Sequence, residues 1–374
     1  MANSKLYWYN SVDLITKNPT NLHLQYDTLP GFHNYSKIHE FFAYNLSMTD
    51  RYGTTKLPIK TEIFEGCRAP EFKSQDLDYE TICLNRARWF MDYAKATNKK
   101  LFVMYSGGID SSAIICSFFQ ACSLEEIRNH ILVGLSEYSI KENPVLYRNF
   151  VLPYFEKVSS HRFISYLGHK DYITITGEGN DQLFGSAVIG DLIGAHGSDI
   201  ISSPLNNDTL FKCFNTKVTE KSVCVNFVEV FNNAVKIAPV PIETVFHYFW
   251  WLNFQFKWQS VYMRVLSFMN KENALTLKPN DNYFTFFHTD EFQLWAMNNS
   301  DKLIRDKWIS YKFTCKDLIY KLTKDENYRD RKAKYGSLIH LVSYKDLGKS
   351  INTDFEILYN HIDPSQWDNN NDFV

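Results

Sequence analysis

The clearest helical pattern of hydrophobic positions lies between Asp78 and Ala96, where apolar side chains recur every three or four residues. This segment ends in a polar turn at residues 97–100 and is followed by the short apolar run Leu101–Tyr105. A run of this length, with charged residues before it and glycines after it, is typical of a strand buried on both faces of a parallel sheet.

The alternation of the two patterns continues along the chain. Residues from Ser111 to Ala121 predict a helix, and Ile131–Leu135 and Tyr172–Thr176 predict two more strands. This order predicts an α/β fold with a doubly wound parallel sheet, which binds ligands at the carboxyl ends of its strands. From about Asp208 onward, long aromatic-rich segments, 244–270 and 291–324, predict a helical C-terminal portion.

Three regions follow from these patterns. Residues 1–77 are rich in Tyr, Asn, Pro and Gly without a sustained period, which predicts an N-terminal attachment of loops and short strands. Residues 78–345 form the expected main domain. Residues 346–374 are expected to be a C-terminal extension that ends in a loose, Asn- and Asp-rich tail.

Composition narrows the cellular setting. The 374 residues carry a formal charge of −2 and a pI near 6.6, which gives no general attraction for nucleic acid or an anionic membrane. The sequence lacks a run of roughly 20 apolar residues that would span a bilayer, so a soluble protein of the cytoplasm is expected. The seven cysteines form no C-x-x-C pair, which predicts reduced thiols rather than a zinc site or disulfides.

The first chemical motif is Ser106-Gly107-Gly108-Ile109-Asp110-Ser111-Ser112, between a predicted strand and a predicted helix. Glycines let backbone N–H groups approach phosphate oxygens, and the helix dipole favours an anion at its start. The Gly-Lys-Ser/Thr ending of a Walker loop is missing. A carboxylate in such a loop indicates a bridging Mg²⁺. The alternative is a strand-to-helix turn in which the glycines serve geometry alone.

On these residues the chain resembles the PP-loop ATP pyrophosphatases, whose S-G-G-x-D-S signature binds the pyrophosphate portion of ATP. A second motif, Gly177-Glu178-Gly179-Asn180-Asp181-Gln182-Leu183-Phe184-Gly185, follows the strand Tyr172–Thr176. It resembles the G-E-G-x-D-E-x-F-G-G motif of asparagine synthetase and its relatives, which include β-lactam synthetase and lasso-peptide cyclase. Gln182 replaces the usual Glu of that motif, and Ser186 replaces its last Gly.

The resemblance covers about residues 78–340 and implies a set of site residues. Asp110 and Asp181 would hold Mg²⁺ on the triphosphate of ATP. The nucleotide would lie against the two motif loops and the second strand. The nucleotide-binding residues would then be Ser106, Gly107, Gly108, Asp110, Ser111, Ser112, Val133, Gly134, Leu135, Gly177, Glu178 and Gly179. Of these, Val133, Gly134 and Leu135 would lie beside the adenine.

A third segment, Lys332-Ala333-Lys334-Tyr335-Gly336, resembles the R-x-K-x-G sequence near the end of the synthetase domain. In that family the lysine stabilises the transition state, so the resemblance makes Lys334 a catalytic candidate together with Asp110 and Asp181. Its ammonium group would offset negative charge that builds up during the reaction. Lys332 is the neighbour that could take this role instead, and a solvated basic face is the alternative for both lysines.

The function implied is that of an ATP-dependent amide-forming ligase. A carboxylate would be adenylated with release of pyrophosphate, and ammonia or an amine would then displace AMP. Glutamine-dependent asparagine synthetases begin with a cysteine nucleophile, whereas this chain begins Met1-Ala2-Asn3-Ser4. The amine is therefore expected to come as free ammonia, from a separate glutaminase or from the substrate itself.

Two other functions stay open at this point. The first is a PP-loop enzyme that modifies a nucleotide or nucleic acid, for which a local basic patch would be needed. The second is a non-catalytic module that binds ATP or AMP. A homodimer is an open alternative to a monomer.

We predict that glutamine alone does not support turnover by the purified chain, because the expected glutaminase nucleophile is missing. Pyrophosphate release with ammonia, and with glutamine in its place, measures this directly. Efficient glutamine-dependent activity would contradict the prediction.

Overall fold

In a computed structural model, the chain forms two compact units that are each assembled from separate stretches of sequence. Unit 1 comprises Met1–Gln75, Asp181–Arg264 and Gln293–Tyr311, and unit 2 comprises Asp76–Asn180, Val265–Phe292 and Lys312–Val374. The structure describes residues 5–7, 41–42, 50–54, 62–64, 67–160, 163–167, 169–185, 187–258, 261–262, 265, 282–304 and 310–332.

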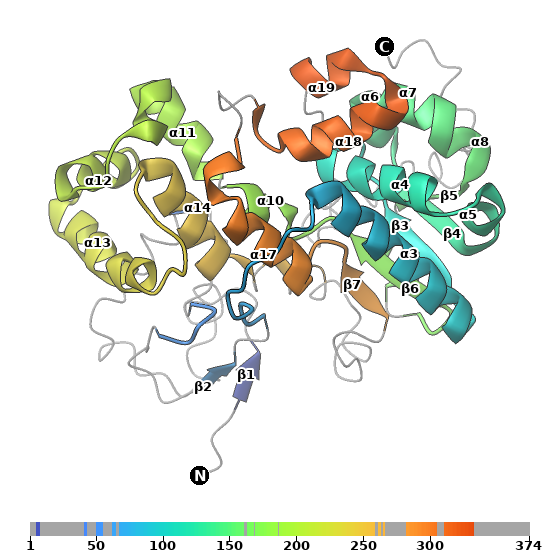
Figure 1. Cartoon of the computed structure of the whole chain (residues 1–374), viewed down its shortest axis with the longest axis horizontal. Helices are drawn as coiled ribbons and strands as arrows, with labels where there is room; N and C mark the ends of the chain where they lie inside the picture. Colours follow the sequence, from blue (N-terminus) through green and yellow to red (C-terminus); the bar gives the residue numbers. More distant parts are fainter. Residues whose placement is uncertain are drawn as a thin grey trace, which may run out of the picture. The chain divides into compact units, whose positions relative to one another are not determined.

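Unit 2 is built on a sheet of five parallel strands (Figure 1). The strands are β3 (Lys100–Met104), β4 (Ile131–Leu135), β5 (Glu156–Ser159), β6 (Tyr172–Thr176) and β7 (Tyr283–Thr285). Their order across the sheet is β5-β4-β3-β6-β7. The chain thus runs outward from β3 to β5 and then returns to the other side of β3, which makes the β3–β6 boundary a topological switch point.

Helices cover both faces of this sheet. Residues Val103, Ile175 and Phe284 lie side by side in register, and the ring centres of Phe284 and of Phe90 in α3 (Tyr79–Thr97) are 5.6 Å apart. On the opposite face, the ring of Phe102 stacks on that of Tyr166 in α9 (Phe163–Tyr166), with the ring centres 4.6 Å apart. The parallel α/β fold predicted from the sequence is confirmed.

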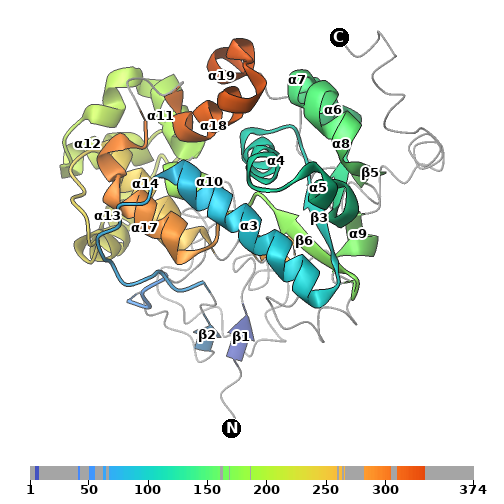
Figure 2. The ribbon, with the colours of Figure 1, turned by 45° about the vertical axis from the view of Figure 1, so that its right-hand side comes forward.

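The helices of unit 2 begin and end at recognisable signals. The helix α3 starts after Asp78, whose carboxylate accepts a hydrogen bond from the Thr81 N–H at 2.8 Å, and ends at Asn98 with a left-handed φ of 52°. It lies beside α4 (Figure 2). The helices are α3 (Tyr79–Thr97), α4 (Ile109–Ala121), α5 (Leu124–His130), α6 (Glu137–Glu142), α7 (Pro144–Leu146), the π-helix η3 (Tyr147–Val151), α8 (Leu152–Tyr154), α9 (Phe163–Tyr166), α18 (Phe313–Thr323) and α19 (Glu326–Arg331).

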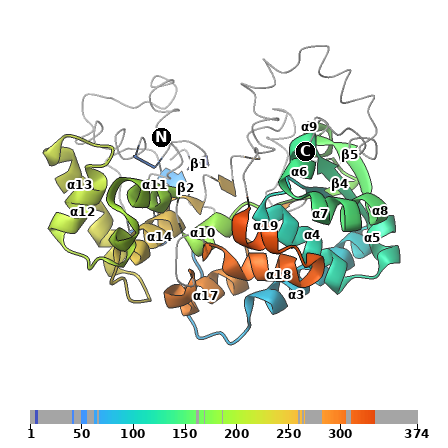
Figure 3. The same cartoon turned by 90° about the horizontal axis from the view of Figure 1, so that it is seen from above.

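Unit 1 is mainly helical, with α11 to α14 gathered together (Figure 3). Aromatic rings fill its interior, and Phe214 packs against Phe41, Phe227 and Phe249 at 5.1 to 5.6 Å. Its elements are β1 (Lys5–Tyr7), β2 (Glu62–Phe64), α11 (Ala187–His196), the 3-10 helix η5 (Ser198–Ser202), α12 (Asn207–Phe214), α13 (Lys221–Lys236), α14 (Val245–Phe256) and the 3-10 helix η6 (Ser300–Lys302). Two helices cross the boundary of the units, α10 (Asn180–Phe184) and α17 (Asp290–Asn298).

A buried arginine joins the three stretches of unit 1. The Arg51 side chain donates to the backbone carbonyls of Cys67 and Arg68 and to the side chain of Gln293. Its guanidinium carbon lies 4.8 Å from the ring centre of Phe254 and 4.4 Å from that of Trp258. Because Arg51 is only 1% exposed, its charge is removed from water, and these contacts offset the free-energy cost of that removal.

No helix in the described part of the chain is both long enough and apolar enough to span a membrane. All seven cysteines are free thiols, and six of them are buried. That these thiols are reduced in the cell stays a prediction.

The predicted elements agree best where the hydrophobic pattern is strongest. Helix α3 and strands β3, β4 and β6 lie within one or two residues of their predicted bounds, and α4 starts two residues before Ser111. The described residues of the C-terminal portion are mainly helical, as predicted, and the short strand β7, which was not predicted, comes from it and extends the sheet. The expected helical segment 291–324 contains two helices, α17 and α18, separated by η6. The predicted tail lies outside the described residues.

We predict that Gly134→Ala destabilises the protein by about 1–3 kcal/mol, because a methyl group there would come within 2.6 Å of the Phe102 ring. The matched control is Gly194→Ala in α11, whose added methyl meets nothing within 4 Å and should stabilise the helix by about 1 kcal/mol. Urea unfolding of both variants measures the two changes. Wild-type stability of Gly134→Ala would contradict this account of the strand.

Candidate nucleotide-binding site

The loop after β3 has the backbone form of an anion-binding turn. Gly107 adopts a left-handed φ of 73°, and a Cβ there would lie 2.2 Å from the Ser139 carbonyl oxygen, so only glycine fits. Gly108 then caps α4, which places the helix N-terminus directly after the glycines. Because β3 lies at the switch point, this N-terminus is where an α/β sheet holds an anionic ligand.

The loop hydroxyls form two groups. The Ser106 hydroxyl lies 3.0 Å from that of Ser111 and accepts from the Gly108 N–H at 3.2 Å, so these two serines bridge the loop. Ser112 is fully buried, and its hydroxyl donates to the Gly107 carbonyl at 3.2 Å. The structure thus places Ser106 and Ser111 at the loop itself and Ser112 behind it.

The loop after β6 meets the first loop at Asp110. Gly177 lies so close that a Cβ on it would come within 3.0 Å of the Asp110 Cβ. The Asn180 amide Nδ2 donates to Asp110 Oδ1 at 2.6 Å. Gly179 adopts a left-handed φ of 92° between them. The two sequence motifs, 70 positions apart, therefore come together at Asp110.

A buried network fixes the orientation of the Asn180 amide. The Tyr79 hydroxyl donates to Asn180 Oδ1 at 2.8 Å, which leaves Nδ2 to face Asp110. The Cys315 thiol lies 3.1 Å from the Tyr79 oxygen, and burial raises its pKa to about 12. The thiol is therefore neutral and acts as a polar packing group rather than a nucleophile.

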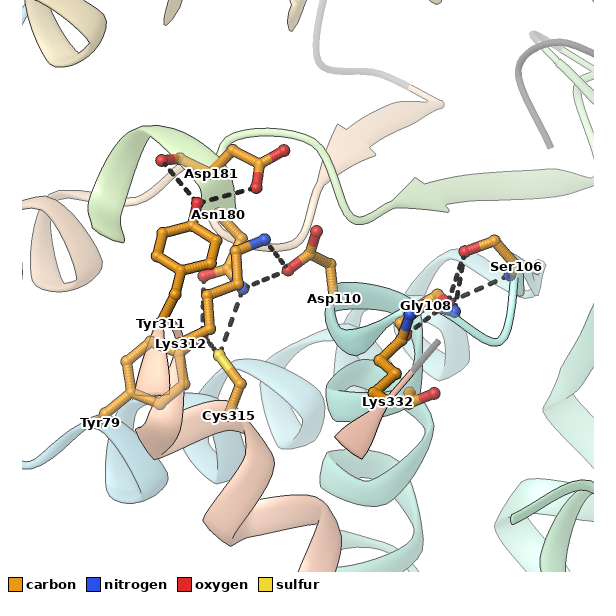
Figure 4. Close-up of polar contacts among 12 residues, drawn as sticks. Tyr79, Ser106, Gly108, Asp110, Asn180, Asp181, Tyr311, Lys312, Cys315 and Lys332 are labelled. Carbon is orange, nitrogen blue, oxygen red and sulfur yellow. Dashed lines mark hydrogen bonds and ion pairs between the residues drawn. The ribbon is translucent and has the colours of Figure 1, made fainter. Parts of the chain in front are cut away.

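Lys312 forms an ion pair with Asp110, as Figure 4 shows. Its Nζ lies 2.5 Å from Asp110 Oδ1, and the lysine side chain is 4% exposed against 26% for the aspartate. Lys312 also has a left-handed φ of 57° at the start of α18, a conformation that costs free energy for a residue with a Cβ. Lys312 was not predicted from the sequence, because it belongs to no recognisable motif.

Two further lysines add positive charge to this part of unit 2. The Lys332 ammonium lies 2.5 Å from Glu142 Oε1, in a pair whose side chains are 10% and 2% exposed. Burial lowers the pKa of Lys316, and the like charges of Lys332 and Lys312 lower it further. Lys312 and Lys332 are thus each paired with a carboxylate near the glycine loop, and Lys316 lies near both lysines and near Asp330. Lys312 and Lys316 are one helical turn apart, and this spacing was a partial sequence signal that the two lysines lie close together.

The strand expected to line the adenine is buried at every position. Gly134 has a structural reason to be glycine, because the Phe102 ring fills the space of its side chain. Val133 and Leu135 are both 0% exposed. Their contact with adenine stays a prediction.

Two of the predicted catalytic residues, Asp181 and Lys334, are not among the described residues of unit 2. Asp181 belongs to unit 1, where its carboxylate accepts a hydrogen bond from the Tyr311 hydroxyl at 3.0 Å. Its backbone carbonyl accepts from the Asn253 amide at 3.2 Å. Lys334 and Ser186 lie outside the described residues. A metal site that joins Asp110 to Asp181, and a catalytic role for Lys334, stay predictions.

The donor set at Asp110 is compatible with Mg²⁺ held mainly by a nucleotide. Among the residues that the structure describes, no three His, Cys, Asp or Glu side chains gather as a cage for a metal ion. Mg²⁺ does not need such a cage, because it commonly binds one or two carboxylates together with substrate phosphates and waters. The Asp110 carboxylate supplies a hard oxygen donor of this kind beside the glycine loop.

A scan against protein-family models and a search of curated proteins found no match for this chain.

We predict that Asp110→Asn destabilises the protein by about 3–5 kcal/mol, because the buried Lys312 ammonium loses the negative charge of Asp110. Lys312→Met should cost less, since Asp110 is partly exposed and keeps the Asn180 amide. The double variant should recover much of the loss. Chemical unfolding of the three variants forms a double-mutant cycle, and additive losses would refute the coupling.

Proposed function

We propose that this chain is an ATP-dependent amide-forming ligase that adenylates a carboxylate and releases pyrophosphate. The observation that carries the proposal is the meeting of two glycine loops at Asp110, at the switch point between β3 and β6. Each loop contains the residues of a motif that resembles asparagine synthetase and other PP-loop enzymes. The fold alone supports only a nucleotide-sized anion at this edge of the sheet.

The glycine turn and the start of α4 favour an anionic ligand. Lys312 and Lys332 pair with Asp110 and Glu142, Lys316 lies near Asp330, and the N-terminus of α4 adds its partial positive charge. Backbone N–H groups at a glycine turn bind phosphate oxygens without selecting a base. This combination fits the triphosphate of ATP better than a neutral ligand.

In the proposed reaction, ATP lies with its β- and γ-phosphates at residues 106–112. A carboxylate oxygen of the substrate attacks the α-phosphorus, and the bond from that phosphorus to the bridging oxygen of pyrophosphate breaks. The amine nitrogen then attacks the carbonyl carbon of the acyl-adenylate, AMP leaves, and the nitrogen loses a proton. Holding both reactants in place supplies much of the acceleration.

The chain's own residues have distinct parts in this proposal. Lys312 holds Asp110 in place. In the proposed reaction its ammonium group would offset the charge of the departing pyrophosphate. Asp110 would hold Mg²⁺ with Asp181 as the expected second ligand. When bound, that ion neutralises phosphate charge as pyrophosphate leaves. Lys334 stays the proposed electrostatic helper for the second step.

We predict carboxylate-dependent exchange of labelled pyrophosphate into ATP when the chain is incubated with a panel of carboxylates. Lys312→Met should lower the exchange rate about 10²-fold, because it removes a charge next to the polyphosphate. The matched control is Lys321→Met on the same helix, whose lysine is 59% exposed and pairs with Glu80 at the surface. It should exchange at the wild-type rate.

Three outcomes would contradict parts of the proposal. A folded chain that binds neither ATP nor pyrophosphate would overturn it. Binding of ATP without exchange for any carboxylate in the panel would favour the non-catalytic module. Salt-sensitive binding of tRNA or DNA, together with exchange that depends on the nucleic acid, would favour the enzyme that modifies nucleic acid.

A further inference from the structure

The Gly107 carbonyl is held by two hydroxyl groups on the buried side of the glycine loop. The Tyr328 hydroxyl donates to this oxygen at 2.8 Å, and the Ser112 hydroxyl lies 3.2 Å from it. The Asn143 amide in turn donates to the Ser112 oxygen at 3.1 Å. Ser112 and Asn143 are 0% exposed and Tyr328 is 4% exposed, so water does not compete for these bonds.

Tyr328 reaches the loop from a distant part of the sequence, 221 positions after Gly107. Its helix, α19, follows α18 through a tight turn in which Lys324 has a left-handed φ of 57°. The Asp325 carboxylate then caps α19 by accepting the Tyr328 N–H at 3.0 Å. The tyrosine is therefore fixed at its backbone and at its hydroxyl.

The geometry of the peptide bond converts this contact into a constraint on the loop. In a trans peptide the C=O and the following N–H point in opposite directions. A Gly107 carbonyl held toward the interior therefore turns the Gly108 N–H away from the interior, where it now meets the Ser106 oxygen at 3.2 Å. The left-handed φ of Gly107 is required for this arrangement.

We propose that Tyr328 is a positioning residue that holds the Gly107–Gly108 peptide plane so that the Gly108 N–H can donate to a phosphate oxygen. This inference rests on the proposed function, since it assigns the bound group to a pyrophosphate moiety. It adds a residue that lies outside both glycine motifs and does not touch the nucleotide itself.

The chemistry of Tyr328 suits this role. Burial raises the pKa of Tyr328 well above its ordinary value, so its phenol stays a hydrogen-bond donor through the pH range of enzyme assays. A neutral donor next to a carbonyl orients the peptide without adding a charge behind the phosphate site. Lys332, one residue beyond α19, forms its ion pair with Glu142 and ties the same segment to α6.

The Tyr328→Phe substitution removes only one oxygen atom. We predict that the variant binds inorganic pyrophosphate about 5- to 10-fold more weakly than the wild type, because the loss of one hydrogen bond changes the binding free energy by about that factor. Titration calorimetry at a temperature well below unfolding measures the affinity. The matched control is Tyr248→Phe in unit 1. Tyr248 is 1% exposed, and its hydroxyl has no hydrogen-bond partner among the residues that the structure describes, so the loss of this hydroxyl should leave pyrophosphate binding unchanged.

A spectroscopic measurement separates positioning from general destabilisation. The chain has 15 glycines, so ¹⁵N-glycine labelling gives a simple amide spectrum in which Gly108 can be assigned by substitution. Tyr328→Phe should shift the Gly108 amide signal, and Tyr248→Phe should not. A lowered unfolding temperature with unchanged affinity and an unshifted Gly108 signal would show a merely structural tyrosine and overturn the inference.

The remaining outcomes are also decisive. Equal pyrophosphate affinity in the wild type and Tyr328→Phe would overturn the inference while leaving the proposed function intact. A wild type that does not bind pyrophosphate would overturn this inference, and one that binds neither ATP nor pyrophosphate would overturn the proposed function as well. If Tyr328→Phe does not fold, Ser112→Ala removes the second donor to the same carbonyl, and its pyrophosphate affinity should fall by a similar factor if the peptide plane matters.

Discussion

The ion pair between Lys312 and Asp110 is the interaction on which the arrangement of the site depends. Removing an ammonium group from water costs several kcal/mol, and a partner carboxylate with good geometry is needed to offset that cost. The pair joins the start of α18 to the start of α4, while Asn180 brings the loop after β6 to the same oxygen. Three segments distant in sequence are thus held at one atom of Asp110.

This centre is supported from behind by groups that carry no charge. The Tyr79 hydroxyl and the Cys315 thiol orient the Asn180 amide, and the Tyr328 and Ser112 hydroxyls orient the Gly107 peptide. Charged groups therefore lie close to the loop, and neutral donors lie behind it. Such an order keeps the strongest electrostatic interactions at the place where an anion would bind.

The sequence predicted the parts of the fold that local patterns determine. Buried parallel strands such as β4 and β6 are short apolar runs, and α3 has a clear apolar face with an Asp cap, so these elements could be recognised. Strand β7 has only three residues and lies among aromatic segments, so its pattern does not differ from that of a helix. Strand β5 is partly exposed and polar, which hides it in the same way.

The same distinction applies to the candidate site. Gly107, Asp110 and Gly177 could be predicted because a glycine turn after a strand is a local signal. Lys312, Tyr328 and Glu142 could not, because their importance arises from contacts across 190 to 221 positions of sequence, as in the Glu142–Lys332 and Gly107–Tyr328 contacts. A lysine or tyrosine in isolation has no pattern that distinguishes it from a surface residue.

The contacts of Arg51 have a consequence for how the protein is made. This side chain needs carbonyl groups at 67 and 68, aromatic rings at 254 and 258 and an amide at 293, so its hydration shell cannot be replaced until residue 293 has left the ribosome. Until then Arg51 stays hydrated, and the aromatic surface that packs against it in the folded unit is exposed to solvent. A stop codon before residue 293 is therefore expected to leave Arg51 without its Gln293 contact, however much of the preceding chain is made.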